Sequence, residues 1–519
     1  MMPWWAIAIL VFGVNFAIWG TVGLSRLFGQ LTIGRWGSRR RAARQGNVVA
    51  LHHDPGGRRS RRTHLSVDDV AVLIPAHNEA AVIEDSLRAI TKLVPRKNIH
   101  VVSDGSTDAT FEVALRCGVK AIKTRQNVGK AGALRDAIER FKLVDRFPVV
   151  MFLDADTRVQ PSYFARALPL FDSPRVAAVA GCVRTDTRRR LSPVGNMLTG
   201  HRMRIYAIGQ RVLKFGQTSR HLNATPIVPG FASIYRTAVL PHININPAGL
   251  VIEDFNMTFE VYQNRLGKVA FTLGAIAITQ DPDNFHDYIR QTRRWALGLW
   301  QTVRRHPPRL NLFTAMLALT LTELITSSVL FVVLPVVAAV LIVPDLVSSA
   351  VGWPGFGSVY TAISTHMTLT RIFYGVVIPD FAMTFLVAVV ERRPRLLLAA
   401  PFFPFMRVLD AGIGLGAIPQ AWLARSDGVW KSPTRRAAPG RHREAAARQV
   451  PAAAMSRQVP AAAMSRQVPA GAVPRQVPAA TAIPVAPAAA EAAYAEAGYP
   501  EAGYGEAAYA EEAAAAASE

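Results

Sequence analysis

Cysteine and acidic residues are both scarce in this chain. Of its 519 residues only Cys117 and Cys182 are cysteines, and their separation matches no metal-ligand spacing. This excludes a disulfide framework and a cysteine-based zinc site, so both thiols are expected to be small core residues. Acidic residues number 36 against 59 lysines and arginines, which gives a formal net charge of +23. The basic residues concentrate beside apolar segments, which favours anionic lipid headgroups or phosphorylated substrates as partners and argues against nucleic acid.

Large apolar side chains are rare in the C-terminal part of the chain. From about residue 444 the sequence is rich in Ala, Pro and Gln, with RQVP recurring every nine residues and a later five-residue EAxY repeat. Such a composition cannot bury enough apolar surface to offset the entropy of the chain. Residues 431–519 are therefore expected to be a disordered tail. Its tyrosines either bind cell-envelope protein partners or belong to a solvated spacer, which is the commoner outcome for this composition.

Long apolar runs elsewhere predict a membrane protein. Trp4 to Leu24 is long enough to cross a bilayer and is followed by several arginines, so residues 1–25 are expected to be an uncleaved anchor. By the positive-inside rule, the basic linker 26–69 and everything up to the next span then lie in the cytosol of a multi-pass cell-membrane protein. Residues 306–430 form the C-terminal membrane region. Its three apolar runs are Leu312 to Val343, Ile372 to Val390 and Leu396 to Leu423.

Charged residues inside these runs mark unusual positions. The run 396–423 contains Arg407, Asp410 and three prolines, which predicts a broken or re-entrant helix that faces protein or a water-filled path. Glu323 either lines an export path or stays hydrated near the cytosolic end of its helix, and the second interpretation is favoured. Four spans place the C-terminus outside the cell, whereas an arginine cluster between residues 435 and 443 favours the inside, so the side of the tail stays open.

The soluble part, residues 70–305, alternates short β-rich runs with helical patterns. The runs are VAVLIPA, IHVVS, VKAIK and PVVMFLD. Helices are expected between them, beginning at Glu79, Thr107 and Gly129. This order predicts an α/β domain with a mostly parallel sheet. Ligands of such sheets bind beyond the carboxyl ends of the strands, where Asp104 and Asp154 both fall, so a nucleotide site is the natural inference.

Acidic motifs and one lysine are candidates for binding a phosphorylated ligand. Asp104 in DGSTD could equally shape its turn and cap the helix that follows. Asp154 and Asp156 follow a very apolar strand, where two unpaired carboxylates repel each other. A divalent cation that bridges to phosphate oxygens would relieve this repulsion. Lys130, at a glycine-bearing helix start, can place a positive charge on a diphosphate.

Two further motifs lie later in the domain. Glu253 and Asp254 open a helical stretch, where carboxylates also suit the positive end of the helix, so this pair alone has a structural explanation. QTRRW at Gln291–Trp295 lies in a basic amphipathic stretch before the apolar runs. Arg294 can neutralise a leaving diphosphate, and the indole of Trp295 can stack on a sugar ring. The alternative is an interfacial helix that these side chains anchor among lipid headgroups, and both roles can hold together.

The ordered set of Asp104, DAD at 154–156, ED at 253–254 and QTRRW resembles the membrane-embedded family 2 glycosyltransferases. These include the cellulose, chitin, hyaluronan and poly-N-acetylglucosamine synthases. The resemblance covers roughly Val70 to Trp300 and extends to the flanking spans. It implies a GT-A fold, a UDP-sugar donor, Mg²⁺ or Mn²⁺ as cofactor, and inversion of the anomeric centre in one displacement.

The resemblance also implies roles for the residues that bind the donor. Asp104 and Asp154 would contact the nucleotide, and Lys130 would assist there. Asp156, together with Asp154, would hold the metal that is bound to the diphosphate.

For the reaction itself, the resemblance implies that Asp254, with Glu253 beside it, is the general base for an acceptor hydroxyl. Arg294 would stabilise the charge that develops on UDP, and Gln291 and Trp295 would hold the acceptor, a glycan or a glycolipid.

These expectations describe a processive β-glycan synthase that passes its polymer between its own C-terminal spans. Two alternatives stay open: a non-processive transferase that forms a glycolipid, and a catalytically silent membrane scaffold. The acidic pair follows Ile where many relatives have Thr, and PIVPGFASIYR at 226–236 lacks the sequence usual in the acceptor-facing loop of cellulose synthases. The sugar and the linkage therefore stay open.

Overall fold

A computed structural model describes residues 3–45, 64–188, 191–347 and 356–423. Every described residue belongs to the unit Met1–Gln449. The expected tail 431–519, with its repeats and any protein partner that it binds, lies outside the described residues.

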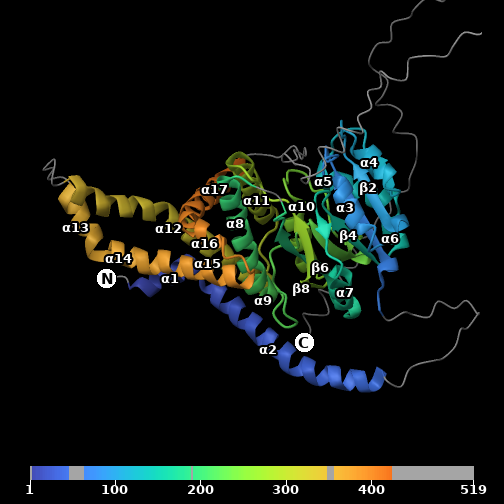
Figure 1. Cartoon of the computed structure of the whole chain (residues 1–519), viewed down its shortest axis with the longest axis horizontal. Coiled ribbons are helices and arrows are strands. Elements are labelled where there is room, and N and C mark those ends of the chain that lie inside the picture. Colours follow the sequence, from blue (N-terminus) through green and yellow to red (C-terminus); the bar gives the residue numbers. More distant parts are fainter. Residues whose placement is uncertain (1–2, 46–63, 189–190, 348–355, 424–519) are drawn as a thin grey trace, which may run out of the picture. The chain divides into compact units, whose positions relative to one another are not determined.

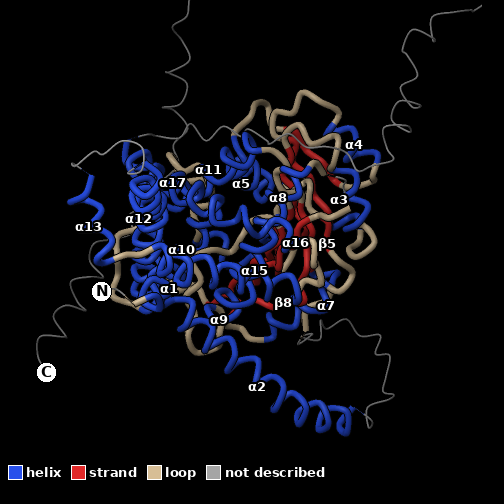
Figure 2. Tube along the Cα trace, turned by 60° about the vertical axis from the view of Figure 1, so that its left-hand side comes forward, coloured by secondary structure: helices blue, strands red, loops and turns tan. Residues whose placement is uncertain are grey.

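The soluble domain is built on one eight-stranded sheet (Figures 1 and 2). Its strands are β1 (Val70–Ala76), β2 (Ile99–Ser103), β3 (Lys120–Lys123), β4 (Val149–Leu153), β5 (Arg158–Val159), β6 (Val176–Thr185), β7 (Ala232–Arg236) and β8 (Lys268–Thr279). They lie in the order β3-β2-β1-β4-β7-β6-β8-β5. The pairs β1–β2, β1–β4, β2–β3 and β6–β8 are parallel, and the pairs β4–β7, β6–β7 and β5–β8 are antiparallel. The expected α/β domain with a mostly parallel sheet is confirmed.

Helices cover both faces of this sheet, which explains why its central strands are apolar throughout. They are α3 (Ile83–Ile90), α4 (Thr110–Arg116), α5 (Gly129–Arg140), α6 (Leu143–Arg146), α7 (Tyr163–Ala167), α8 (Pro193–Ile208), α9 (Phe215–Gln217), α10 (Glu253–Gln263) and α11 (Phe285–Arg305). In β1, Val70, Val72 and Ile74 belong to the core beneath α3 and α4, whereas Ala71 and Leu73 belong to the core beneath α5 and α6. Successive side chains of a strand point to opposite faces, and Figure 2 shows α3 and α5 on opposite sides of the red strands.

The apolar helices are α1 (Trp4–Phe12), α2 (Val14–Gln45), α12 (Leu312–Val347), α13 (Phe356–His366), α14 (Leu369–Ile372), α15 (Ile378–Val390), α16 (Leu396–Ala399) and α17 (Phe403–Leu423). Among the described residues, the segments Leu312–Ile342, Leu369–Val390 and Leu396–Leu423 are long and apolar enough to cross a membrane. These three segments coincide closely with the C-terminal runs that the sequence predicts. α13 was not expected, and α2 continues to Gln45 through part of the expected linker 26–69.

The first apolar segment, which is expected to be the membrane anchor over residues 1–25, is bent. It is a bent pair, Trp4–Phe12 and Val14–Gly29, at an angle of 72°. Gly13 lies at the break with a φ of 80°, a conformation that suits glycine. The carboxylate of Glu323 accepts hydrogen bonds of 2.9 Å from both the backbone N–H and the side-chain amide of Asn15. Glu323 therefore caps the start of α2, a third role beside the two that its sequence position suggests.

Charged contacts join the apolar helices to the soluble domain. Arg204 of α8 donates two hydrogen bonds of 2.6 Å to Asp380 of α15. Asp410 of α17 accepts a 2.8 Å hydrogen bond from the hydroxyl of Tyr288 and lies 2.9 Å from Nε2 of His201. Asp410 therefore faces protein, one of the two settings expected for it, and it fixes α8 and α11 against α17.

Candidate active site

The site forms beyond the carboxyl ends of β1, β2 and β4. Asp104 follows β2 and Asp154 follows β4, so the parallel pairing of both strands with β1 brings them to one edge of the sheet. The backbone N–H of Asp154 donates a 2.9 Å hydrogen bond to the carbonyl of Phe231. This contact brings the segment 226–236 up to the aspartates.

Lys130 lies at the centre of the acidic residues. It is the second residue of α5, and its Nζ lies 2.9 Å from Oδ1 of Asp154 and 3.0 Å from Oε1 of Glu253. Burial lowers the pKa of Lys130, but the nearby carboxylates of Asp154, Glu253 and Asp254 raise it more, and the net pKa lies well above 10.5. Lys130 is therefore always charged and holds the acidic motifs together.

Glu253 and Asp254 share one environment but have opposite pKa shifts. Burial raises the pKa of Glu253, but the charge of Lys130 and the hydrogen bonds to the carboxylate together lower it by more, so the net pKa is below its usual value. For Asp254, burial and then the charge of Glu253 raise the pKa to about 8. Oδ2 of Asp254 accepts a 2.8 Å hydrogen bond from the N–H of Gly230. A Cβ at Gly230 would strike this carboxylate and approach Lys130, which explains the glycine in PGF.

Asp104 is completely buried and organises the loop that precedes Lys130. Its Oδ1 accepts hydrogen bonds of 2.9 Å from the hydroxyl of Thr124 and from the N–H of Val128. Burial raises its pKa, partly offset by these hydrogen bonds. Its Oδ2 is buried and has no hydrogen-bond partner within the described part of the chain. Asp104 thus stabilises the start of α5 rather than capping the helix that follows DGSTD.

Asp154 and Asp156 are the pair that the sequence predicts to hold a divalent cation. Oδ1 of Asp156 accepts hydrogen bonds from the hydroxyls of Thr157 at 3.1 Å and Thr279 at 3.3 Å. Burial raises the pKa of Asp154, Lys130 opposes this, and Asp156 adds to it. The residues that the structure describes contain no group of three or more His, Cys, Asp or Glu side chains able to hold a metal. Two carboxylates do fit Mg²⁺, which commonly takes its other ligands from phosphates and water.

The helix α11 carries QTRRW and contacts the acidic motif from the other side. The N–H of Val251 donates a 2.9 Å hydrogen bond to Gln301, and a Cβ at Gly298 would meet Ile252. Arg294 lies one turn before Gly298 and therefore on the side of α11 that faces Ile252. It forms no hydrogen bond or ion pair with a described residue. The Oε1 atom of Gln291 is buried and has no described partner either.

Arg202 of α8 belongs to this region, although no sequence motif singled it out. It is 2% exposed, and its guanidinium lies 4.3 Å from the ring centre of Tyr288 and 4.5 Å from that of Trp295. It also donates a 2.6 Å hydrogen bond to Thr292. Arg202 therefore covers one face of the indole that the sequence assigns to the acceptor sugar. The sequence around Arg202, HRMR, contains no pattern that distinguishes a buried arginine from one on the surface.

The structure brings four of the candidate residues, Lys130, Asp154, Glu253 and Asp254, into direct contact. Asp156 adjoins this cluster, and Asp104 supports the loop before it. Gln291, Arg294 and Trp295 lie on the neighbouring helix α11 and form no hydrogen bond with the cluster among the described residues. The site thus combines an α/β domain that has an acidic edge with a charged helix, α11, that leads into the apolar helices.

Comparison with known proteins shows what this domain is similar to. Residues 68–298 match the profile of the family described as "Glycosyltransferase like family 2". Poly-beta-1,6-N-acetyl-D-glucosamine synthase of Staphylococcus epidermidis is 24% identical over 257 residues, 46% of this chain and 59% of that protein. Probable glucomannan 4-beta-mannosyltransferase 15 of Arabidopsis thaliana is 26% identical over 257 residues, 47% of this chain and 46% of that protein. The chain thus spans about half the length of these relatives, whose names describe β-linked polysaccharide synthesis.

Among solved structures, a mannosyltransferase from Pyrobaculum calidifontis in complex with GDP-Man and Mn²⁺ is similar, with a TM-score of 0.42 and 18% identity. The similarity covers 76% of this chain and 99% of that one.

Proposed function

We propose that this protein is an inverting membrane glycosyltransferase that transfers a sugar from a UDP-sugar to a growing β-linked polysaccharide. The observation that carries the proposal is the contact of Lys130 with both acidic motifs, beside a carboxyl group, Asp254, whose pKa is about 8. A general base works best when its pKa is close to the working pH. The names of the relatives favour a polymer as the product.

In the proposed reaction, an acceptor hydroxyl attacks the anomeric carbon of the donor from the face opposite the diphosphate. The new bond joins the acceptor oxygen to this carbon, the bond from the carbon to the diphosphate oxygen breaks, and Asp254 takes the hydroxyl proton. Glu253 stays ionised beside Lys130 and keeps the proton affinity of Asp254 high. Arg294 would face the charge that develops on UDP, and Gln291 and Trp295 would bind the acceptor sugar.

The donor would lie over the carboxyl ends of β2 and β4. The buried Oδ2 of Asp104 is available to accept a hydrogen bond from an N–H of the nucleotide base. Lys130 lies close enough to Asp154 to bind the diphosphate as well. Mg²⁺ or Mn²⁺ held by Asp154 and Asp156 would neutralise the diphosphate. Because the diphosphate would compete with Asp154 for Lys130, we expect the Lys130 contacts to change when the donor binds.

We further propose a cytosolic domain in the cell membrane, processive elongation, and export of the polymer between the protein's own helices. The basic residues that follow the first apolar segment favour this orientation. A glycolipid product would need nearly the same catalytic residues. The length of the product therefore has to be measured.

The test uses membranes that contain the full chain, incubated in turn with labelled UDP-glucose, UDP-N-acetylglucosamine and UDP-glucuronate. We expect one donor to give labelled material of high molecular mass, and a variant with Asp254→Asn to give none. Asp145→Asn, which changes an exposed carboxylate of α6, is the matched control and should keep full activity. A short, organic-soluble product from the same donor would refute processivity, and undiminished transfer by Asp254→Asn would refute the assignment of the base.

A further inference from the structure

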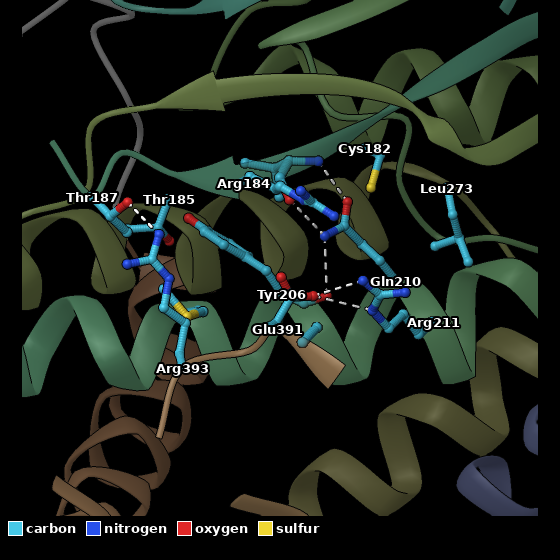
Figure 3. Close-up of a pocket in the computed structure, with 13 residues that line it drawn as sticks. Cys182, Arg184, Thr185, Thr187, Tyr206, Gln210, Arg211, Leu273, Glu391 and Arg393 are labelled. Atoms are coloured by element: carbon cyan, nitrogen blue, oxygen red, sulfur yellow. Dashed lines mark hydrogen bonds and ion pairs between the residues drawn. The ribbon is translucent and has the colours of Figure 1, made fainter. Parts of the chain in front are cut away.

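A cavity of about 110 Å³ lies apart from the acidic cluster, at the junction of the soluble domain with the apolar helices (Figure 3). Its walls come from the end of β6, from α8 with the π-helical segment Gly209–Lys214, and from the turn that follows α15. The polar residues that matter here are Arg184, Thr185, Thr187, Arg211, Glu391 and Arg393. Figure 3 shows Glu391 and Arg393 reaching from the turn towards Arg211 and Thr187.

Positive charge is in excess around this cavity. Arg211 is neutralised by Glu391, whose Oε1 lies 2.7 Å from the guanidinium. Arg393 donates a 2.7 Å hydrogen bond to the hydroxyl of Thr187, which carries no charge. Neither Arg184 nor Arg393 has a carboxylate within ion-pair distance among the described residues. The nearest acid along the chain, Asp186, is already paired with Arg158 at 2.7 Å and with Arg188 at 3.3 Å.

A buried hydroxyl in the wall also lacks a partner. Thr185 is 8% exposed, and its Oγ1 is buried without a hydrogen-bond partner in the described part of the chain. Leaving a buried hydroxyl without a hydrogen bond is unfavourable, so this hydroxyl indicates a ligand that would form the missing hydrogen bond. Two guanidinium groups and a free hydroxyl are the groups that bind a phosphate.

The position of the cavity identifies the kind of phosphate. The candidate span Leu369–Val390 ends directly before Glu391. Arg392, Arg393 and Arg395 follow this end and are exposed. Arginines at the cytosolic end of a span lie at the depth of the headgroups of anionic lipids and attract them. A phosphate at this depth belongs to a lipid.

We propose that this cavity binds the phosphate of an anionic membrane lipid, with Arg184, Arg393 and the hydroxyl of Thr185 as its ligands. The site is separate from the sugar-transfer site and does not depend on the identity of the sugar. Because α8 carries both the wall of the cavity and Arg202, the bound lipid would rest on the helix that contacts Trp295.

The experiment measures lipid binding to the purified full chain by native mass spectrometry in neutral detergent, with phosphatidylglycerol or phosphatidylcholine added. We expect the wild type to retain one phosphatidylglycerol in preference to phosphatidylcholine. Replacing Arg184→Gln and Arg393→Gln together should weaken this retention by at least about tenfold, because charge-assisted hydrogen bonds are lost. Arg395→Gln, an exposed arginine of the same turn that does not line the cavity, is the control and should retain the lipid.

Each other outcome overturns the proposal. Retention by the double variant that equals the wild type would show that the lipid binds elsewhere. An equal loss in Arg395→Gln would show a diffuse attraction to the basic turn rather than a site. Displacement of phosphatidylglycerol by an equal concentration of inorganic phosphate would assign the cavity to a soluble anion. Both substituted side chains are exposed, so the variants should fold, and unchanged melting temperatures would verify this.

Discussion

Replacing Asp254 by Asn should abolish sugar transfer and at the same time stabilise the protein at alkaline pH. The side chain of Asn has the shape of a protonated Asp and can still accept the hydrogen bond from Gly230. It cannot take a proton from an acceptor. The wild-type carboxyl group, by contrast, has to ionise beside Glu253 in a buried position, and this is why its pKa is about 8.

The size of the effect follows from the pKa shift. The pKa rises from 3.8 to about 8, so the folded protein binds the proton of Asp254 more tightly than the unfolded chain does. The stability that this carboxyl group contributes is therefore complete below pH 4 and is lost as the pH rises through about 8. A shift of about 4 units corresponds to at most ~5 kcal/mol. Since Glu253 and Lys130 readjust, we expect an advantage of about 2–4 kcal/mol for the Asn variant at pH 9.

The assay is thermal unfolding of the ligand-free protein in detergent at pH 6 and pH 9. For a domain of this size, ~1 kcal/mol corresponds to roughly 2–4 °C, so Asp254→Asn should melt roughly 5–10 °C above the wild type at pH 9. At pH 6 the unfolded chain has already released the proton that the folded protein still holds, so the difference should be about half as large. Asp145→Asn should follow the wild type at both values. A variant that melts below the wild type at pH 9, or by the same difference at both pH values, would refute the electrostatic account of this site.

Two further substitutions test the contacts around Asp254. Lys130→Met leaves Asp154 and Glu253 without their cation, so we expect the free energy of unfolding to fall by about 3–5 kcal/mol at pH 8. This loss in the free energy of unfolding should become smaller below pH 5, where the carboxylates take up protons. A loss that does not change with pH would indicate lost packing instead. Arg202→Met removes the cation that lies on Trp295, and a stack of this kind contributes ~2 kcal/mol when desolvated. We expect the KM for the acceptor to rise by up to about thirtyfold with the donor KM unchanged, and a red shift of the tryptophan emission should accompany it. Equal changes in both KM values would contradict a role in holding the acceptor.

The strands of the domain could be predicted from the sequence because both faces of the sheet are covered. VAVLIPA, IHVVS and the apolar run before Asp154 each became a strand at the expected place, and α5 begins at Gly129 as expected. The other helix starts were wrong by three or four residues. α3 begins at Ile83 instead of Glu79, and α4 begins at Thr110 instead of Thr107.

A long-range contact explains these late starts. The N–H of Glu79 donates a 2.9 Å hydrogen bond to the hydroxyl of Thr110, and the N–H of Ala80 donates one of 3.0 Å to Asp108. The two loops therefore bind each other before either helix begins. Capping patterns describe only neighbours in the sequence, so they place the helix start at the first suitable residue. The start of α2 after the break at Gly13 also depends on a long-range contact. The carboxylate that caps α2 belongs to Glu323, which is far away in the sequence.

The acidic residues of the site were recognisable from their spacing, but the position of Lys130 was not. The sequence suggests a lysine that faces a diphosphate, whereas the structure places its ammonium group between Asp154 and Glu253. Gly230 was likewise unpredictable, because it lies 24 residues before the carboxylate that it contacts. The position of Lys130 and the contact of Gly230 with Asp254 both depend on how β4, β7 and α10 pack together. No local sequence pattern predicts this packing.

The pairing of Lys130 with Glu253 explains why two adjacent carboxyl groups can have different tasks. Without a lysine, burial would raise the pKa of both, and a single proton would be shared between them. Lys130 lies 3.0 Å from Glu253 and lowers its pKa, so the negative charge stays on Glu253. Burial and that fixed charge together then raise the pKa of Asp254 to about 8. When two neighbouring acids have pKa values pushed apart in this way, the one with the higher value is suited to exchange a proton near neutral pH, and the other stabilises charge. The asymmetry therefore favours Asp254 over Glu253 as the base, independently of any resemblance to other enzymes.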